Sequence, residues 1–200
     1  MKKELDLGKE KIGKLLLAFS VPCIISMIIN SIYNIVDQIF IGKGVGIIGN
    51  AATNVIFPIV IICNALAGLV GNGAAANLSL RLGEGKKDEA KKSIGSSITL
   101  LFIISILVVI IFELLLPNLV YAFGCTKNVY SSAMTYGRII VFGSFFMIIY
   151  SGLSQIIRAD GSPKYSMICL LVGAILNIIL DPIFIFTFNM GVAGGAIATV

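Results

Sequence analysis

The sequence contains no histidine, and its four cysteines are isolated at Cys23, Cys63, Cys125 and Cys169. None of them forms a CxxC pair, so neither a common zinc-binding motif nor a dithiol redox motif is present. No histidine is available to complete a metal site or to activate a nucleophile, and neither a GxGD nor a GxSG motif indicates an intramembrane hydrolase. These absences predict a protein that is not an enzyme and that has no cofactor.

Charged residues are also scarce, at 12% of the 200 residues, whereas 58% are hydrophobic. Soluble domains carry about a quarter charged residues. A small soluble fold leaves much of its surface exposed and could not hide this much apolar area. The net charge of +5 does not predict nucleic-acid binding, because the basic residues cluster between apolar runs and do not alternate with aromatic residues. We therefore expect membrane lipid to surround this chain.

Five long apolar runs indicate membrane-spanning helices, each of which needs about 20 residues. They cover residues 15–41, 51–80, 94–116, 131–157 and 165–188, and a sixth run begins near Val192. The basic start resembles a signal peptide, but the first run is too long and no small-residue cleavage site follows it. We predict an all-α, polytopic transmembrane bundle over residues 15–200, preceded by a cytoplasmic tail at residues 1–14.

Lysine and arginine are distributed unequally between the two sides of the predicted bundle. Twelve lie in the tail, between the second and third runs, and between the fourth and fifth runs, whereas the other side holds only Lys43, Lys127 and Arg138. The positive-inside rule then places the N-terminus in the cytoplasm, for a multi-pass protein of the cytoplasmic (inner) membrane. The mixed charges of residues 81–92 are predicted to form a short surface helix.

Three acidic residues interrupt the apolar runs: Asp37, Glu113 and Asp181. An ionised aspartate at the centre of a spanning helix costs about 2.5–3.5 kcal/mol, so we expect such a residue only where it is used. Glu113 precedes Pro117 near the predicted end of its helix. A side chain in that place can extend to the headgroups, so we assign Glu113 no function.

Asp37 belongs to a polar stripe on the first helix. The stripe comprises Ser26, Asn30, Tyr33, Asn34 and Asp37. Their spacings of three and four place them on one helix face, which cannot contact lipid and must face protein or water. The alternative is an aspartate near the membrane surface, because Lys43 follows six residues later.

Asp181 is the stronger candidate for a functional acid. Asn177 lies four residues earlier, on the same helix face. Pro182 removes the amide that would bond to the carbonyl of Ile178. A carboxylate, an amide and a freed carbonyl would form an oxygen-rich site suited to a proton or Na⁺; the alternative is a kink with an interhelical hydrogen bond. Asp37 and Asp181 are predicted at similar depth, so they could face each other across one cavity and bind a cation.

Several segments resemble the MATE family, the multidrug and toxic compound extrusion transporters. Residues 20–42, SVPCIISMIINSIYNIVDQIFIG, look like the first helix of that family. Residues 156–186 resemble its passage from the fourth to the fifth helix, with an RxxGxPK connection and an NxxxDP helix. The loop RLGEGKKDEAKK and the closing GVAGGAIATV also fit their places in that order. The resemblance covers essentially all 200 residues.

This resemblance implies twelve helices in two six-helix lobes, of which the chain would be the N-lobe without its partner, the C-lobe. It implies an antiporter in which H⁺ or Na⁺ enters as an amphipathic, often cationic, drug leaves by alternating access. The cation site, of the bacterial and archaeal branch with paired aspartates, would comprise Asp37, Asn177 and Asp181, where Na⁺ would bind. Supporting groups would be the hydroxyls of Tyr136 and Thr199, to which the helix stripe adds Asn34.

Other functions remain open at this point. A lipid-linked saccharide flippase of the same superfamily would need basic groups for pyrophosphate, and the helices offer few beyond Arg138. One half of a major-facilitator transporter would explain a charged loop, but GEGKKDEA matches that family's loop poorly and the NxxxDP helix stays unexplained. A channel or a purely structural protein gives no reason for the paired acids.

Overall fold

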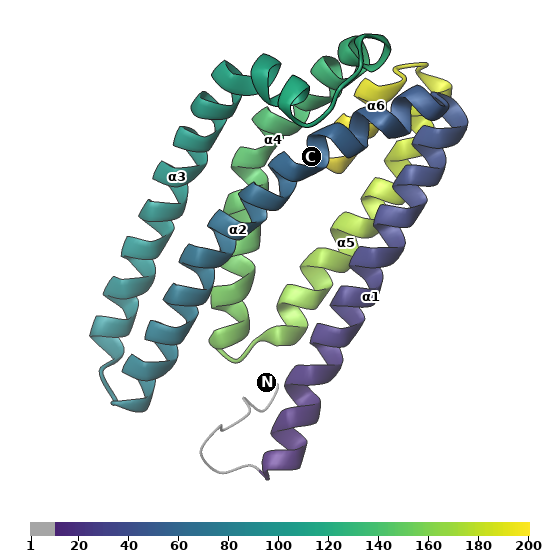
Figure 1. Cartoon of the computed structure of the whole chain (residues 1–200). Helices are drawn as coiled ribbons and strands as arrows, with labels where there is room; N and C mark the ends of the chain where they lie inside the picture. The colour runs from purple at the N-terminus through teal and green to yellow at the C-terminus, as the bar shows by residue number, and fades with distance from the viewer. Residues whose placement is uncertain (1–10) are drawn as a thin grey trace.

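A computed structural model of the chain describes residues 11–200, which are helical almost throughout (Figure 1). The first ten residues of the predicted tail lie outside the described residues. The elements, in chain order, are α1 (Ile12–Gly44), α2 (Ile47–Gly83), α3 (Lys87–Ala122), α4 (Lys127–Ala159), α5 (Pro163–Pro182), the π-helical turn η1 (Ile183–Thr187) and α6 (Val192–Thr199). No strand occurs in this part of the chain, and the predicted all-α class is confirmed.

Five helices in the described part of the chain are long and apolar enough to cross a membrane, with α5 and η1 forming one span. They match the five predicted runs, and α6 begins at Val192, as expected. The helices of the first four spans have 33 to 37 residues, so they extend well beyond the apolar runs. Hydropathy detects only the part of a helix that lies in the hydrocarbon core. The helices are longer than these runs because their backbone hydrogen bonding continues into the polar ends.

The structure corrects two predicted helix boundaries. α3 does not end before Pro117 but continues through it to Ala122, so Glu113 lies nine residues from the end of its helix. The short surface helix predicted over residues 81–92 does not form. These residues instead complete α2 and begin α3, joined by a turn at Gly85, whose φ of 77° favours glycine.

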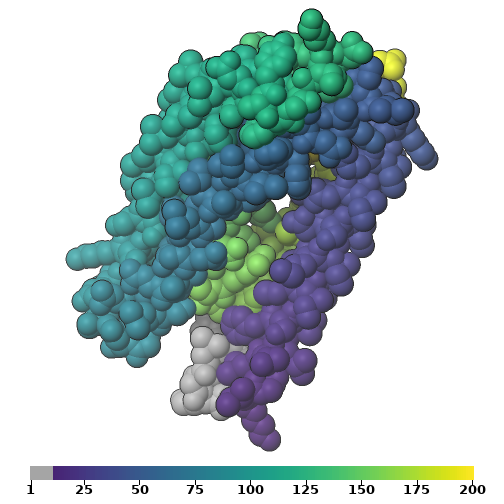
Figure 2. Space-filling model, in the orientation of Figure 1, coloured from purple at the N-terminus to yellow at the C-terminus, as the bar shows by residue number. Residues whose placement is uncertain are grey.

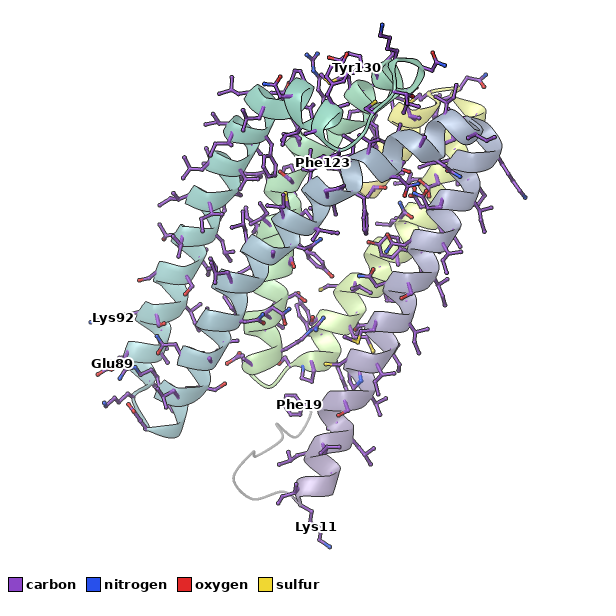
Figure 3. The ribbon with its side chains drawn as sticks, viewed as in Figure 1. Lys11, Phe19, Glu89, Lys92, Phe123 and Tyr130 are labelled. Carbon is purple, nitrogen blue, oxygen red and sulfur yellow. The ribbon has the colours of Figure 1, made fainter. Side chains whose placement is uncertain are left out.

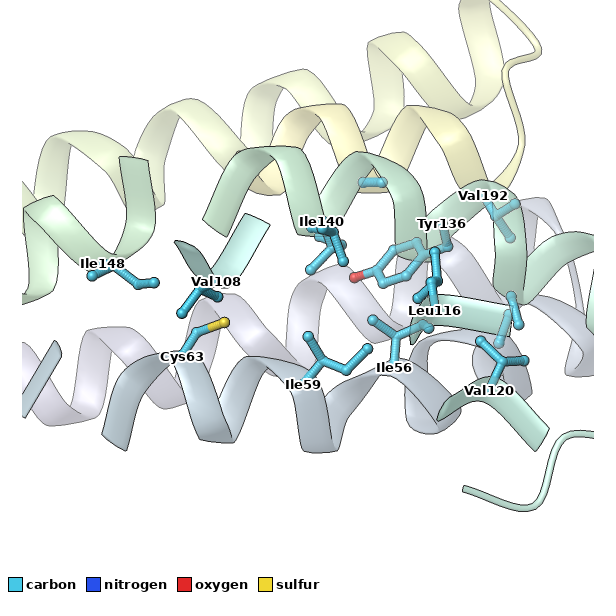
Figure 4. Close-up of a cluster of buried hydrophobic side chains, with 14 of the residues drawn as sticks. Ile56, Ile59, Cys63, Val108, Leu116, Val120, Tyr136, Ile140, Ile148 and Val192 are labelled. Atoms are coloured by element: carbon cyan, nitrogen blue, oxygen red, sulfur yellow. The ribbon is translucent and has the colours of Figure 1, made fainter. Parts of the chain in front are cut away.

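The helices form two groups. α2 lies along α4 and α3, whereas α1 lies along α5, and α6 packs against α4 (Figure 1). Buried side chains of α2, α3 and α4 form the main apolar core (Figure 4). Its fully buried members include Ile56 and Ile59 of α2, Leu116 and Val120 of α3, and Ile148 of α4. Because lipid tails are as apolar as these side chains, close van der Waals packing holds the core together.

The ends of the bundle differ in charge. Lys11 lies at the same end as the α2–α3 turn with Glu89 and Lys92, and this end is called the basic end; Phe123 and Tyr130 lie at the opposite end (Figure 3). At the α2–α3 turn, Arg81 is 3.0 Å from the Glu89 carboxylate. The connections richer in lysine and arginine therefore lie at one end, in agreement with the unequal distribution of these residues in the sequence.

A hollow opens on one face of the bundle, where α2 and α4 meet and α1 stands apart (Figure 2). Its volume is about 710 Å³. Its lining residues are Asn64, Ala65, Gly68, Leu69 and Asn72 of α2, and Ser151 and Gln155 of α4. The hollow is thus lined by uncharged amides and small groups, between two helices that are otherwise strongly apolar.

Candidate functional site: a buried pair of carboxyl groups

Asp37 and Asp181 lie close together, although 144 positions separate them in the sequence. α1 and α5 run side by side, and each presents its aspartate to the other. Asp181 is fully buried and Asp37 is only 6% exposed. The two carboxyl groups are within hydrogen-bonding reach, so a proton on either one can bridge the pair. The sequence-based expectation that the two acids could meet agrees with this geometry.

Local structure fixes the position of Asp181. It is the penultimate residue of α5, and Pro182 has no amide to continue the α-helical pattern. The chain continues as the π-helical turn η1, in which the amide of Phe188 donates to the carbonyl of Ile183 over 3.0 Å. π-turns often occur at functional sites because they reorient the neighbouring groups. The break that Pro182 predicts is therefore a change of helix type directly after the acid.

The site is rich in buried polar side-chain atoms that lack a hydrogen-bond partner within the described residues. Among residues 11–200, neither oxygen of Asp181, nor Oδ1 of Asp37, nor either side-chain atom of Asn177 has a hydrogen-bond partner. Asn177 is 5% exposed and precedes Asp181 by one helical turn. Buried polar groups without partners are rare and costly in proteins. A proton or a cation with oxygen ligands would satisfy the oxygens of this set, as predicted from the sequence.

A short chain of polar side chains, which the sequence did not predict, holds Asp37. The side-chain amide of Gln38 donates to Oδ2 of Asp37 over 3.3 Å. Thr53 of α2 lies 3.1 Å from Oε1 of Gln38 and 2.9 Å from the carbonyl of Asn50, so its hydroxyl can donate to either acceptor. This chain links the acid on α1 to α2. Only the position of Gln38 next to an intramembrane acid pointed to it in the sequence.

Tyr136 and Thr199 lie beside the carboxyl pair. Tyr136 of α4 is 6% exposed and lies near enough to both aspartates to interact with their charges. Its hydroxyl lies near enough to the side chain of Thr199 in α6 to interact with it. Thr199 also donates to the carbonyl of Gly195 over 2.9 Å. Side chains from α1, α4, α5 and α6 thus meet at one point of the bundle.

Asn34 is not part of this cluster. Its side chain is exposed and donates to the carbonyl and the side chain of Asn30, at 2.7 and 2.8 Å. The predicted polar stripe of α1 therefore divides in two. Ser26 and Asp37 are buried, whereas Asn30 and Asn34 pair with each other on an exposed face of α1.

Glu113, the third intramembrane acid, lies apart from the site on α3. Its carboxylate is 3.4 Å from Nε of Arg138 in α4, and its side chain is half-buried at 31% exposure. The expectation that Glu113 lies close to a helix end is wrong, because α3 continues for nine residues beyond it. It lies inside the span and has an arginine partner.

Five helices of membrane-spanning length and a buried pair of aspartates define a multi-pass membrane protein with an intramembrane acidic site. The chain belongs to the MatE family, whose profile matches residues 22–183. The family predicted from the sequence is therefore confirmed.

Relatives and solved structures agree with this assignment. The chain is 33% identical to the multidrug export protein MepA of Staphylococcus aureus over 193 residues, which are 96% of this chain and 42% of MepA. It superposes with a TM-score of 0.92 on the MATE multidrug transporter DinF-BH, at 39% identity over 100% of this chain and 45% of that one. A structure of a MOP superfamily transporter from Pyrococcus furiosus, at 29% identity, gives a TM-score of 0.91 over 100% of this chain and 44% of that one.

The chain thus spans less than half the length of these proteins. Their names describe export proteins and transporters, in agreement with the prediction that the chain is not an enzyme.

Proposed function

We propose that the full-length protein is a cation-coupled antiporter that exports amphipathic, often cationic, compounds across the cytoplasmic membrane by alternating access. The observation that carries this proposal is the carboxyl pair of Asp37 and Asp181, buried beside Asn177 with acceptors that lack donors. H⁺ or Na⁺ would neutralise the pair. Because the two acids belong to different helices, neutralisation changes how closely α1 and α5 approach each other.

The hollow between α2 and α4 supports a path for the exported compound. Its volume of about 710 Å³ is within the usual range for small-molecule sites, about 300–1,000 Å³. Its lining offers the amides of Asn64, Asn72 and Gln155 but no charge. Such a wall accepts compounds by shape and hydrogen bonding, with little demand on their identity. The opposite wall would come from a second six-helix lobe, the C-lobe of the full-length protein.

The charges at the two ends support an orientation for the proposed transport. The basic end carries Lys11 and the lysine-rich start of α3, so the positive-inside rule places it in the cytoplasm. The carboxyl pair then lies in the outer half of the membrane, since Asp37 is seven residues, or roughly 10 Å, from the opposite end of α1. A cation would enter the pair from outside, release the compound outward, and leave inward after the lobes have rocked.

A flippase for lipid-linked saccharides finds less support. A flippase would need basic groups that face the hollow. Arg138 of α4 instead pairs with Glu113 of α3, away from the hollow. The acid pair has no evident use in binding a pyrophosphate.

Efflux of a cationic dye by the full-length protein in vesicles, with pH and Na⁺ gradients imposed separately, tests the proposal. Asp181→Asn should abolish gradient-driven efflux, because the pair can no longer gain and lose a cation. Asp160→Asn is the matched control, since Asp160 is an exposed acid at the end of α4. Coupled export that is unchanged in Asp181→Asn would reject the proposal.

A second variant separates binding from coupling. Asp37→Asn should still bind the dye, because the hollow between α2 and α4 is intact, but an imposed gradient should no longer release it. Equilibrium binding to the purified variant and its dependence on pH and Na⁺ give the two readouts. Loss of dye binding with retained gradient response would contradict the assigned role of Asp37.

A further inference from the structure

An ion pair lies inside the membrane-spanning part of the bundle, away from the carboxyl site. Nε of Arg138 in α4 is 3.4 Å from Oε1 of Glu113 in α3, and the arginine side chain is 62% exposed. A guanidinium carries five N–H donors, and this contact uses only the one at Nε. The terminal nitrogens make no hydrogen bond to another described residue, and the exposure of the side chain leaves them accessible. An arginine in this position is costly unless a further partner satisfies it.

An apolar groove begins one helical turn from this ion pair and runs between the same two helices. Its volume is about 330 Å³, and its lining residues are Ile106, Val109, Ile110, Phe142, Phe145 and Phe146. Glu113 follows Ile110 by three residues and Arg138 precedes Phe142 by four, so the pair lies at one end of the groove. Phe142 and Phe146 are 61% and 62% exposed, so the groove opens on the outside of the bundle, where α3 forms the edge (Figure 1).

The depth of the pair suits a headgroup contact. Glu113 and Arg138 are nine and eleven residues from the ends of α3 and α4 opposite the basic end, or roughly 15 Å. Helices of 36 and 33 residues are about 50 Å long and exceed a hydrocarbon core of about 30 Å by roughly 10 Å at each side. The pair is then about 5 Å inside the hydrocarbon boundary, a distance that an arginine side chain can bridge.

We propose that Arg138 and this groove form a binding site for one phospholipid of the leaflet opposite the basic end. The terminal nitrogens of Arg138 bind the lipid phosphate, and one acyl chain lies in the groove, which runs from the pair toward the bilayer centre. Glu113 holds the guanidinium at the mouth of the groove and is a positioning residue. The charge of Arg138 and the direction in which the groove runs favour a phospholipid as the ligand. Only a lipid presents a phosphate at the hydrocarbon boundary and an apolar chain deeper in the membrane.

Retention of phosphatidylglycerol by the detergent-purified, full-length protein, measured by native mass spectrometry during lipid titration, tests the charged part of the site. Arg138→Gln should weaken binding about fivefold, the usual effect of one basic residue at an anionic surface. Lys127→Gln, which removes a charge at the start of α4, should not. Glu113→Gln should retain the lipid, because the side-chain oxygen of glutamine can still hold the guanidinium, which keeps its charge. An equal loss in Glu113→Gln and Arg138→Gln would overturn the proposal, since the pair would then be purely structural.

A second pair of variants tests the groove without changing charge. Ile110→Trp fills the groove and should lower lipid retention at least as much as Arg138→Gln. Ile111→Trp is the matched control, because the neighbouring side chain is similarly exposed, at 48% against 52%, and lies outside the groove. Equal retention by both tryptophan variants would overturn the proposal. So would displacement of the lipid by inorganic phosphate alone, which would assign the site to a free anion.

Discussion

Gly71 of α2 lies directly against Gly152 of α4: a Cβ atom at Gly71 would come within 2.9 Å of both the Cα atom and the carbonyl oxygen of Gly152. A Cβ atom at Gly152 would in turn meet the side chain of Leu101 in α3 at 2.6 Å. Three helices therefore meet at a point where only glycine fits. The glycine-rich segment of α2 serves packing at this position, whereas Gly68 and Asn72 line the hollow.

Gly71→Ala should destabilise the full-length protein by about 1–3 kcal/mol, because the added methyl group meets backbone that cannot move aside. Gly73→Ala is the control, since nothing lies within 4 Å of its added Cβ, and alanine favours the helix. Thermal unfolding in detergent measures the difference. Equal melting temperatures for the two variants would show that the α2–α4 contact can relax.

Asn72→Leu should weaken dye binding without affecting gradient coupling, because it removes a hydrogen-bonding amide from the hollow but leaves the carboxyl pair intact. Loss of one such bond corresponds to about 1 kcal/mol, or roughly a fivefold increase in the apparent KM for efflux. Asn77→Leu makes the same change at an exposed site of α2 outside the hollow. A similar KM in both variants would remove the hollow from the proposed path.

Thr53→Val should weaken the apparent affinity for the coupling cation about fivefold. The change removes the hydroxyl that lies 3.1 Å from Gln38, whose amide in turn donates to Asp37, and one hydrogen bond contributes about 1 kcal/mol. Efflux rates at graded pH or Na⁺ measure the shift. Thr135→Val serves as control, because the Thr135 hydroxyl is exposed and donates only to the carbonyl of Ser131. Identical cation dependence in both variants would show that Gln38 does not orient Asp37.

Ser166→Ala should destabilise the fold by about 1–3 kcal/mol, since it leaves the buried hydroxyl of Ser154 without its partner. Ser166 joins α5 to α4 through Ser154 and accepts a hydrogen bond from Nε of Arg158 at 3.1 Å. Ser31→Ala removes an exposed hydroxyl of α1 that bonds only to the carbonyl of Met27, and it should be neutral. Chemical or thermal unfolding of both variants in detergent distinguishes these outcomes.

The sequence predicts the spans and the two main acids, but not the details around them. Long apolar runs and the cost of an intramembrane charge act along one chain, so Asp37, Asn177 and Asp181 can be found from their neighbours alone. The orientation of Asn34 could not be found in this way. It precedes Asp37 by three residues, about 60° around the helix, and only the position of α5 decides which of the two faces inward.

The partners of the acids also depend on tertiary structure. Thr53 contacts Gln38 because α1 and α2 meet at one end of the bundle, and Arg138 meets Glu113 because α3 and α4 lie side by side. No spacing within one helix encodes either contact. The continuation of α3 through Pro117 was missed for a related reason, because spanning helices tolerate proline where neighbouring groups satisfy the freed backbone.

The π-turn after Asp181 gives the acid and the segment beyond it separate orientations. Such a turn contains one residue more than an α-turn, and one residue corresponds to about 100° around a helix axis. The side chains of Ile183–Thr187 are thus turned around the helix axis relative to their places in an uninterrupted α5. A transition of these five residues between π and α geometry would reorient the side chains beyond Asp181 while the acid itself stayed in place.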